Sequence, residues 1–263
     1  MHNAAYAALG MDRVYVAFHV TPDAIAVAIR SIAALGILGV NLTVPHKEAG
    51  ARMISDLSDE GRILGAINCI VNRNGKLHGD NTDARGLERD LRDLGVKMRG
   101  GRAIVIGAGG AGAAATLACI RMGAREIVIA NRTRSRATAV ARRIRLAAGS
   151  ATIAVSGLDA LTDASLLSYT AAIINATPMG LVTRSFADLD YKATPETCFF
   201  YDTVYAAEPT AFVRPAIALG RRYADGAGML INQGELAFRL FNGVASPKGV
   251  MRRALLERLG RKS

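Results

Sequence analysis

The sequence predicts an α/β protein made of two domains. Apolar runs of strand length alternate with stretches of helical spacing, which is the pattern of βαβ units and of a mainly parallel sheet. The chain has 263 residues, enough for two domains of ordinary size. A basic, glycine-containing stretch at residues 95–101 interrupts the alternation, so we expect a domain boundary near residue 98.

The expected strands follow the apolar runs in chain order: Val14–Val20, Ile37–Val44, Ile67–Asn72, Ala103–Gly107, Glu126–Ala130, Ala171–Asn175 and Phe199–Val204. The expected helices are Asp23–Leu35, Arg85–Asp93, Gly110–Met122, Ser135–Ala147 and Pro209–Leu219, with a closing pair at Gly234–Asn242 and Lys248–Leu259. We place the first domain at residues 1–98, completed by C-terminal helices within 232–263, and the second at residues 99–231.

Composition narrows the class of protein. Hydrophobic residues make up 51% of the chain and charged residues 21%, which predicts a globular protein with a substantial core. The net charge of +11 favours an anionic ligand, but nucleic acid is disfavoured because aromatic residues are only 5% and no recognition motif occurs. The uncharged residues 103–120 are too rich in glycine to make a good membrane span.

Three scattered cysteines form neither a disulfide framework nor a zinc motif, and they indicate a reducing, cytoplasmic setting. The first residues do not read as a signal peptide. The four histidines lack metal-ligand spacing, so we assign no metal.

A glycine-rich turn follows the strand expected at Ala103–Gly107. Gly107-Ala108-Gly109-Gly110-Ala111-Gly112 is a G-x-G-x-x-G motif between a strand and a helix, the context of a Rossmann-type dinucleotide site. The first glycine permits the turn, the second lets backbone approach a pyrophosphate, and the third lets the helix pack closely. A tight turn of small residues without a ligand is the alternative.

The end of the next strand indicates NADP. That strand runs into Asn131-Arg132-Thr133-Arg134-Ser135-Arg136, and no carboxylate occurs from residue 127 through 158. An NAD site usually carries an acidic residue here, whereas arginine accommodates a 2′-phosphate. Arg132 could therefore stack on the adenine or face the 2′-phosphate, and Arg136 could make a charge-assisted contact with that phosphate. A solvated basic helix start with the same composition is the alternative.

Polar residues of the first domain suggest a substrate site. In Gly39–Lys47 the apolar and polar residues alternate, so Asn41 and Thr43 are expected on one strand face. Lys47 follows Pro45 in the first turn of an expected helix, where a cation opposes the helix dipole; a surface lysine is the alternative. Asp83 could be a helix cap, or it could lie near Lys47 as a proton-transfer partner.

Taken together, these segments resemble the shikimate dehydrogenase family, which includes the quinate/shikimate dehydrogenases. The segments that carry the resemblance are His2-Asn3, Asn41–Lys47, Gly65–Asn68, Asn81–Asp83, the glycine turn, Asn131–Thr133, Asn175–Gly180, Asp202–Tyr205 and Gly226–Gln233. They occur in the family's order over essentially the whole chain.

The resemblance implies NADPH-dependent reduction of 3-dehydroshikimate to shikimate, in aromatic amino acid biosynthesis on the chorismate pathway, and is compatible with a homodimer. It implies Lys47 and Asp83 as the catalytic pair. The substrate-binding residues that it implies are Asn41, Thr43, Asn68, Tyr205 and Gln233. The cofactor-binding residues are Asp59, Gly107, Ala108, Gly109, Gly110, Ala111, Asn131, Arg132, Thr133, Arg136, Thr177, Thr203, Gly226 and Met229.

The resemblance departs at the front of the chain. Family members have an additional strand and a Ser-x-Ser-Pro loop just before the His-Asn pair, whereas this sequence begins with Met1-His2-Asn3. We therefore expect an unpaired sheet edge, and either an upstream translation start or a truncated paralogue. A dehydrogenase of quinate-like specificity and a catalytically silent NADP-binding protein are the alternatives to a shikimate dehydrogenase.

Overall fold

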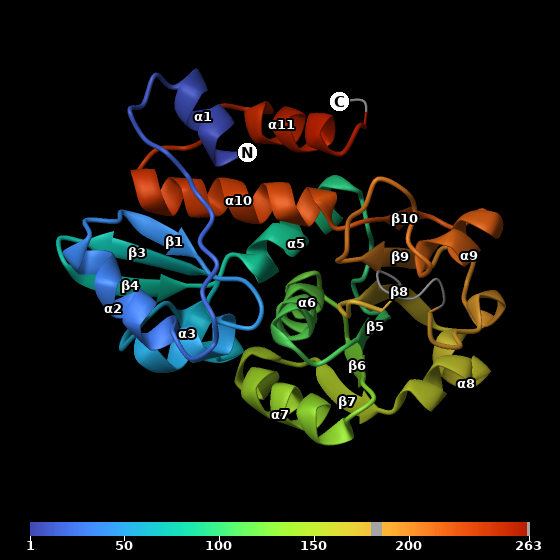
Figure 1. Ribbon diagram of the computed structural model, residues 1–263. Coiled ribbons are helices and arrows are strands. Elements are labelled where there is room, and N and C mark those ends of the chain that lie inside the picture. Colours follow the sequence, from blue (N-terminus) through green and yellow to red (C-terminus); the bar gives the residue numbers. More distant parts are fainter. Residues whose placement is uncertain (180–185, 262–263) are drawn as a thin grey trace. The chain divides into compact units, whose positions relative to one another are not determined.

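The structure is a computed structural model that describes residues 1–179 and 186–261 (Figure 1). The chain divides into two compact units. Unit 1 comprises Met1–Gly86 and Leu230–Ser263, and unit 2 comprises Leu87–Met229. This division falls about one helix earlier than residue 98, within α5 (Asp83–Asp93), and on the C-terminal side it falls within α10 (Ala227–Asn242).

Unit 1 is built on a four-stranded sheet of order β1-β3-β4-β2. Its strands are β1 (Gly39–Asn41), β2 (Asp56–Leu57), β3 (Cys69–Arg73) and β4 (Lys76–Asp80), and its helices are α1 (His2–Ala8), α2 (Ile25–Ala34), α3 (Lys47–Met53), α4 (Asp59–Leu64), α11 (Val250–Arg258) and most of α10. Ile25, Ile29 and Ile32 of α2 form one core with Ile67, which precedes β3, and with Ile70 of β3.

The sheet of unit 1 is mixed, which corrects the expectation of a mainly parallel arrangement for this part. β1 pairs antiparallel with β3, and β3 pairs antiparallel with β4. The tight turn between β3 and β4 is Asn74-Gly75, where both residues have positive φ, 54° and 85°. Asn-Gly is a strong hairpin signal because both residues tolerate this conformation. The strand β4 could thus have been predicted but was not.

The strand expected at Val14–Val20 does not form. Within the described residues this segment pairs with no strand, and Tyr15 instead exchanges hydrogen bonds with the side chain of Asn3, at 2.6 and 2.9 Å. Val14, Val16 and Phe18 are exposed. A strand depends on the hydrogen bonds of a neighbour, so apolar alternation alone was not sufficient. The nearby expectation for Ile37–Val44 was too long, since β1 ends at Asn41 and is the edge of the sheet.

Unit 2 is built on a six-stranded parallel sheet of order β10-β9-β8-β5-β6-β7. Its strands are β5 (Arg102–Ile106), β6 (Glu126–Ala130), β7 (Thr152–Ser156), β8 (Thr170–Asn175), β9 (Phe199–Asp202) and β10 (Tyr223–Ala224). Its α-helices are α6 (Gly110–Arg121), α7 (Arg134–Ile144), α8 (Ala164–Leu167), α9 (Val213–Ala218) and most of α5. Short 3₁₀ turns lie at Arg145–Ala147, Leu158–Thr162 and Tyr191–Ala193.

The core of unit 2 lies on the sheet. Ile104 and Ile106 of β5, Phe200 of β9 and Phe212 beside α9 are fully buried together. β5, β6, β8 and β9 lie close to their predicted positions because each is a short, continuously apolar run buried on both faces. β7 was missed, since its pattern is only half-buried. Helix α9 is shorter than predicted, and α10 begins seven residues before Gly234.

The uncharged stretch at residues 103–120 is divided between strand β5 and helix α6. Among the described residues, no helix has both the length and the apolar character needed to cross a membrane.

Replacing Gly112 by alanine should destabilise the protein. A Cβ at this position would lie 2.2 Å from the backbone oxygen of Gly107, and backbone yields little. We expect a loss of about 2–3 kcal/mol in the free energy of unfolding, measured in urea. Gly109→Ala is the matched control: its Cβ would meet nothing within 4 Å, so the loss should stay below about 1 kcal/mol. Equal losses in both variants would contradict this explanation of the turn.

Candidate active site

Two charged side chains meet in unit 1. Lys47 is the first residue of α3 and Asp83 is the first residue of α5. Lys47 Nζ lies 2.6 Å from Asp83 Oδ2, and the two side chains are only 18% and 6% exposed. This low exposure limits screening by solvent, so the pair is more than a surface ion pair. The sequence had left open whether Lys47 is a surface lysine and Asp83 a cap, and the structure instead brings the two into contact.

Asn68 joins this pair to the rest of the site. Its side-chain NH₂ donates to Asp83 Oδ1 at 2.8 Å, to Thr82 Oγ1 at 3.0 Å and to Gln233 Oε1 at 3.2 Å. Its side-chain oxygen accepts from the backbone N–H of Thr82 at 2.8 Å. Asn68 is buried and lies just before β3, while Gln233 lies on α10. The Asn68 side chain therefore connects three segments that are far apart in the sequence: its own segment before β3, the start of α5, and α10.

The residues before Asp83 fix its position. Asn81 is fully buried, and its side-chain oxygen accepts from the backbone N–H of Asp83 at 3.0 Å. Its NH₂ group donates to the backbone oxygen of Ala66 at 2.8 Å. Asn81 thus satisfies a free N–H at the start of α5, the role that the sequence had considered for Asp83 itself. The Asp83 carboxylate is left to contact Lys47 and Asn68.

Asn41 also joins the site, whereas Thr43 does not contact it. Asn41 Nδ2 donates to the backbone oxygen of Asn68 at 3.1 Å. Its Oδ1 accepts from the Tyr15 hydroxyl at 2.9 Å. Tyr15 was missed because its segment was interpreted only as an apolar strand. Thr43 lies beyond the end of β1 and is exposed.

Within unit 1, Asp59 has no hydrogen bond or ion pair with the Asn68 cluster among the described residues. Tyr205 belongs to unit 2, follows β9 and is 40% exposed. Asp59 starts α4 in unit 1, its side chain is 90% exposed, and its carboxylate accepts from Arg62 at 2.6 Å.

The glycine turn of unit 2 leaves a place for a ligand. Gly107 has a φ of 112°, and a Cβ there would lie 2.9 Å from the backbone oxygen of Ala176. Gly109 is exposed, and a Cβ there would meet only open space. Ala108, Gly110 and Ala111 complete the turn, and α6 begins at Gly110. Free backbone N–H groups at a helix start favour phosphate, so the turn is suited to a diphosphate.

Basic side chains follow the neighbouring strand β6. Arg132, Thr133 and Arg136 are exposed, and Asn131 Nδ2 bridges to the backbone oxygen of Thr133 at 2.8 Å. In the part of the chain that the structure describes, Arg132 and Arg136 have no ion-pair partner, whereas Arg134 lies 3.7 Å from Asp159. Two cations are therefore available at this strand end for an anionic group.

The other predicted cofactor residues of unit 2 follow β8 (Thr177), β9 (Thr203) and β10 (Gly226) or lie in the first turn of α10 (Met229). Thr177 follows β8 and donates its hydroxyl to Asn175 Oδ1 at 2.7 Å. A Cβ on Gly226 would lie 2.1 Å from the backbone oxygen of Thr203, so these two segments pack closely. Met229 is buried at the end of unit 2. Gly180, the last residue of the motif at Asn175–Gly180, lies outside the described residues.

Asp202 is a buried carboxyl group that the sequence interpretation did not assign. It is the last residue of β9 and has no exposed surface. Burial raises the pKa of its carboxyl from 3.8 to about 6, opposed by hydrogen bonds from Thr210, Val204 and Asn175, while Asp225 adds to the increase. A polar residue at the carboxyl end of a buried parallel strand was a signal that could have found it.

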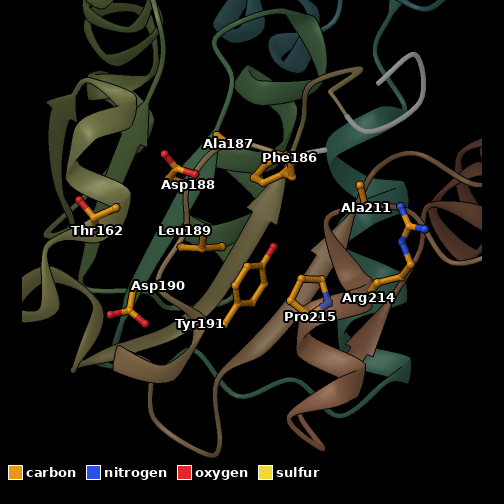
Figure 2. A pocket seen from close by; sticks show the side chains of 10 residues that line it. All are labelled: Thr162, Phe186, Ala187, Asp188, Leu189, Asp190, Tyr191, Ala211, Arg214 and Pro215. Atoms are coloured by element: carbon orange, nitrogen blue, oxygen red, sulfur yellow. The ribbon is translucent and has the colours of Figure 1, made fainter. Parts of the chain in front are cut away.

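A separate hollow of about 640 Å³ lies in unit 2 (Figure 2). In Figure 2 the residues 186–191 line one side, and Ala211, Arg214 and Pro215 line the other. None of the predicted catalytic or binding residues lines it. The residues that line the hollow therefore include neither the glycine turn nor Lys47 and Asp83.

Together, the fold and these groups indicate a class of protein. Counted from β5, the strand order of unit 2 is 3-2-1-4-5-6, with a glycine turn after the first strand, which is the Rossmann-type dinucleotide-binding arrangement. Combined with a paired lysine and aspartate in a second α/β unit, it is the architecture of a nicotinamide-dependent oxidoreductase.

Comparison with known proteins gives the family. Family models match residues 1–70 (shikimate dehydrogenase substrate binding domain), residues 91–178 (shikimate / quinate 5-dehydrogenase) and residues 226–256 (shikimate 5'-dehydrogenase C-terminal domain). The shikimate dehydrogenase (NADP(+)) of Citrifermentans bemidjiense is 37% identical over 98% of this chain and 90% of its own length. The chain belongs to the shikimate dehydrogenase family.

Solved structures agree with this assignment. Shikimate 5-dehydrogenase from Thermus thermophilus, in complex with NADP(H) and shikimate, is 32% identical with a TM-score of 0.84, covering 98% of this chain and 92% of that one. Quinate dehydrogenase from Corynebacterium glutamicum, in complex with NAD, is 28% identical with a TM-score of 0.88, covering 97% and 92%. Solved proteins named for different substrates, in complexes with NADP(H) or with NAD, thus share this fold.

The pKa of Asp202 predicts a pH dependence of stability. A folded-state pKa above the unfolded value means that folding favours the protonated carboxyl. The stabilisation is fully present below the unfolded pKa and is lost as the pH rises through about 6. Asp202→Asn removes this titration, so its free energy of unfolding relative to wild type should be higher at pH 8 than at pH 5, by about 1–3 kcal/mol. A difference that does not change with pH would contradict the assigned burial.

Proposed function

We propose that this protein is a shikimate dehydrogenase that catalyses the NADP-dependent, reversible reduction of 3-dehydroshikimate to shikimate. The observation that carries the proposal is the buried contact of Lys47 with Asp83, at 2.6 Å, beside Asn68 and Gln233. Its relatives bear the name shikimate dehydrogenase (NADP(+)), and the Thermus thermophilus structure is a complex with NADP(H) and shikimate. The hydrogen-bonding side chains of this cluster are suited to a polar substrate such as shikimate.

In the proposed site, unit 1 binds the substrate. The substrate is a polyol with a carboxylate, and it needs several hydrogen-bonding groups at fixed positions. Asn68, Gln233 and Asn41 are held by mutual hydrogen bonds, so their positions are set before the substrate binds. Thr43 and Tyr205, both exposed, are assigned here as further substrate contacts.

Lys47 and Asp83 handle the proton of the reacting alcohol. A bound NADP⁺ would supply the nicotinamide ring as the acceptor for the hydride of the alcohol carbon. The hydroxyl proton must leave in the same reaction, and Lys47 Nζ is the group that we assign to exchange it, with Asp83 Oδ2 as its partner. Asp83 is oriented by Asn68 and Asn81, which keeps the carboxylate on Lys47.

Unit 2 is the proposed NADP-binding unit. Gly107, Ala108, Gly109, Gly110 and Ala111 would hold the diphosphate, and Asn131, Arg132, Thr133 and Arg136 would hold the adenosine 2′-phosphate. We assign Thr177, Thr203, Gly226 and Met229, with Asp59, to the nicotinamide side. The open space at Gly109 and the unpaired state of Arg132 and Arg136 within the described chain support this placement.

We also propose that the protein works in the cytoplasm. The three cysteines are free and buried, as expected in the reducing cytoplasm.

The direct test is oxidation of shikimate by the purified protein with NADP⁺, followed by the nicotinamide absorbance band. Parallel reactions with quinate and with NAD⁺ are needed because a quinate dehydrogenase complexed with NAD shares this fold. We expect the highest kcat/KM for shikimate with NADP⁺. Absence of turnover with all four combinations, while NADP⁺ still binds, would identify a catalytically silent protein instead.

Lys47→Ala should abolish most of the turnover. Loss of a positioned acid–base group lowers kcat by roughly 10²–10⁴-fold, while NADP⁺ affinity should change little because Lys47 is not among the residues assigned to the cofactor. Steady-state kinetics and calorimetric titration with NADP⁺ measure the two quantities. Lys76→Ala, at an exposed lysine of the same unit, is the control. Full turnover of Lys47→Ala would remove this residue from the mechanism.

Arg132→Ala should weaken NADP⁺ selectively. A charge-assisted contact contributes about 1.5–3 kcal/mol, so the Kd for NADP⁺ should rise by roughly 10–100-fold. The Kd for NAD⁺, which lacks the 2′-phosphate, should change about twofold or less. Arg142→Ala, an exposed arginine of α7, is the matched control. Equal losses for the two cofactors would refute the 2′-phosphate assignment.

A further inference from the structure

Asp202 lies at the centre of a buried hydrogen-bond network at the carboxyl ends of β8 and β9. Asn175 and Asp202 are the last residues of these strands, they face each other in register, and both are fully buried. Asp202 Oδ1 accepts from Asn175 Nδ2 and from the backbone N–H of Val204, each at 3.0 Å. Asp202 Oδ2 accepts from the Thr210 hydroxyl at 2.5 Å. The carboxyl group thus connects two strand ends and the segment that leads into α9.

The network continues into the loops that follow both strands. Asn175 Oδ1 accepts from the backbone N–H of Thr177 at 3.1 Å and from its hydroxyl at 2.7 Å. The Thr177 hydroxyl oxygen in turn accepts from the backbone N–H of Met179 at 3.2 Å. Asn175 can hold Thr177 with its oxygen because its NH₂ group is engaged by Asp202. Asp202 therefore sets the orientation of the Asn175 amide and, through it, the first residues of the loop.

These loops contact both proposed parts of the cofactor site in unit 2, namely the glycine turn and the residues assigned to the nicotinamide side. Thr177 Cγ2 would lie 2.8 Å from a Cβ on Gly107, so the β8 loop packs on the glycine turn. The backbone oxygen of Val204 accepts from the N–H of Gly226 at 3.0 Å, so the β9 loop packs on the segment before α10. Thr177, Thr203 and Gly226 are the residues assigned above to the nicotinamide side.

We propose that Asp202 is a positioning residue which, through Asn175 and Val204, holds residues 176–179 after β8 and residues 203–204 after β9 in the conformation that binds the nicotinamide half of NADP. This inference rests on the proposed function for the identity of the cofactor, but its geometry is that of unit 2 alone. Asp202 acts by accepting hydrogen bonds. Asparagine has an oxygen in the place of Oδ1 and an NH₂ group that can donate to the Thr210 hydroxyl, so it preserves the network without the charge. Alanine leaves Asn175 and Thr210 without their buried acceptor.

The experiment compares two ligands in matched variants. NADP⁺ and adenosine 2′,5′-bisphosphate, which lacks the nicotinamide half, are titrated calorimetrically into wild type, Asp202→Ala and Asp202→Asn. We expect Asp202→Ala to raise the Kd for NADP⁺ by about tenfold or more while the Kd for the bisphosphate changes about twofold or less. Asp202→Asn should restore NADP⁺ affinity to within about threefold of wild type.

Three results would overturn the proposal: unchanged NADP⁺ affinity in Asp202→Ala, an equal loss for both ligands, or no rescue by Asp202→Asn. If Asp202→Ala does not fold, Thr210→Val removes the donor to Oδ2, and Thr210→Ser restores it. Thr210→Val should then show the same selective loss for NADP⁺, and an unselective loss or none would count against the proposal.

The outcome is separate from that of the proposed reaction. If wild type binds both ligands but does not oxidise shikimate, the proposed substrate is wrong, and the comparison of the two ligands still decides the role of Asp202.

Discussion

The candidate site of unit 1 is held together by the hydrogen bonds of a single buried amide, that of Asn68. This side chain contacts Asp83, Thr82 and Gln233, which lie up to 165 residues from Asn68 in the sequence. A buried amide that lost these partners would incur the cost of an unsatisfied polar group, about 1–3 kcal/mol. The contact of Lys47 with Asp83 depends on the same arrangement, because Asn68 holds the other oxygen of that carboxylate.

In unit 2, too, buried polar side chains form hydrogen bonds that hold the backbone, and they lie at the ends of strands β8 and β9. Apolar side chains fill its parallel sheet, so polar chemistry is confined to the strand ends, where the chain leaves the core. Asn175 and Asp202 end adjacent strands and are buried together. The glycine turn after β5 packs on the loop after β8 because Gly107 has no Cβ, and α6 packs on the turn because Gly112 has none. The backbone of the turn is therefore exposed at Gly109 without a side chain in front of it.

The sequence predicted the parts of this structure that depend on local patterns. The glycine turn, the buried strands β5, β6, β8 and β9, and the helix start at Lys47 all follow from short-range composition and spacing. The strand prediction for Val14–Val20 was wrong because strand formation depends on a partner outside the segment. The antiparallel hairpin of β3 and β4 was missed although Asn74-Gly75 indicates it.

Long-range contacts were the part that residue patterns could not supply. Nothing local shows that Asn68 would meet Gln233, or that Thr210 would donate to Asp202. Family resemblance supplied the assignment of Asn68 and Gln233, but not the hydrogen bonds between them. The sequence placed Asp202 in a motif but indicated no role for it. Its burial and the three hydrogen bonds that it accepts indicate one.

Lys47 and Asp83 are expected to work as one unit in the reaction, and a double-mutant cycle on kcat with shikimate and NADP⁺ measures whether they do. The cycle uses Lys47→Ala, Asp83→Ala and the double variant, each checked for folding by thermal unfolding. Residues that act as a unit give strongly non-additive losses, so the double variant should lose about as much as the more damaged single variant. Losses that multiply, as for two independent residues, would contradict this mechanism.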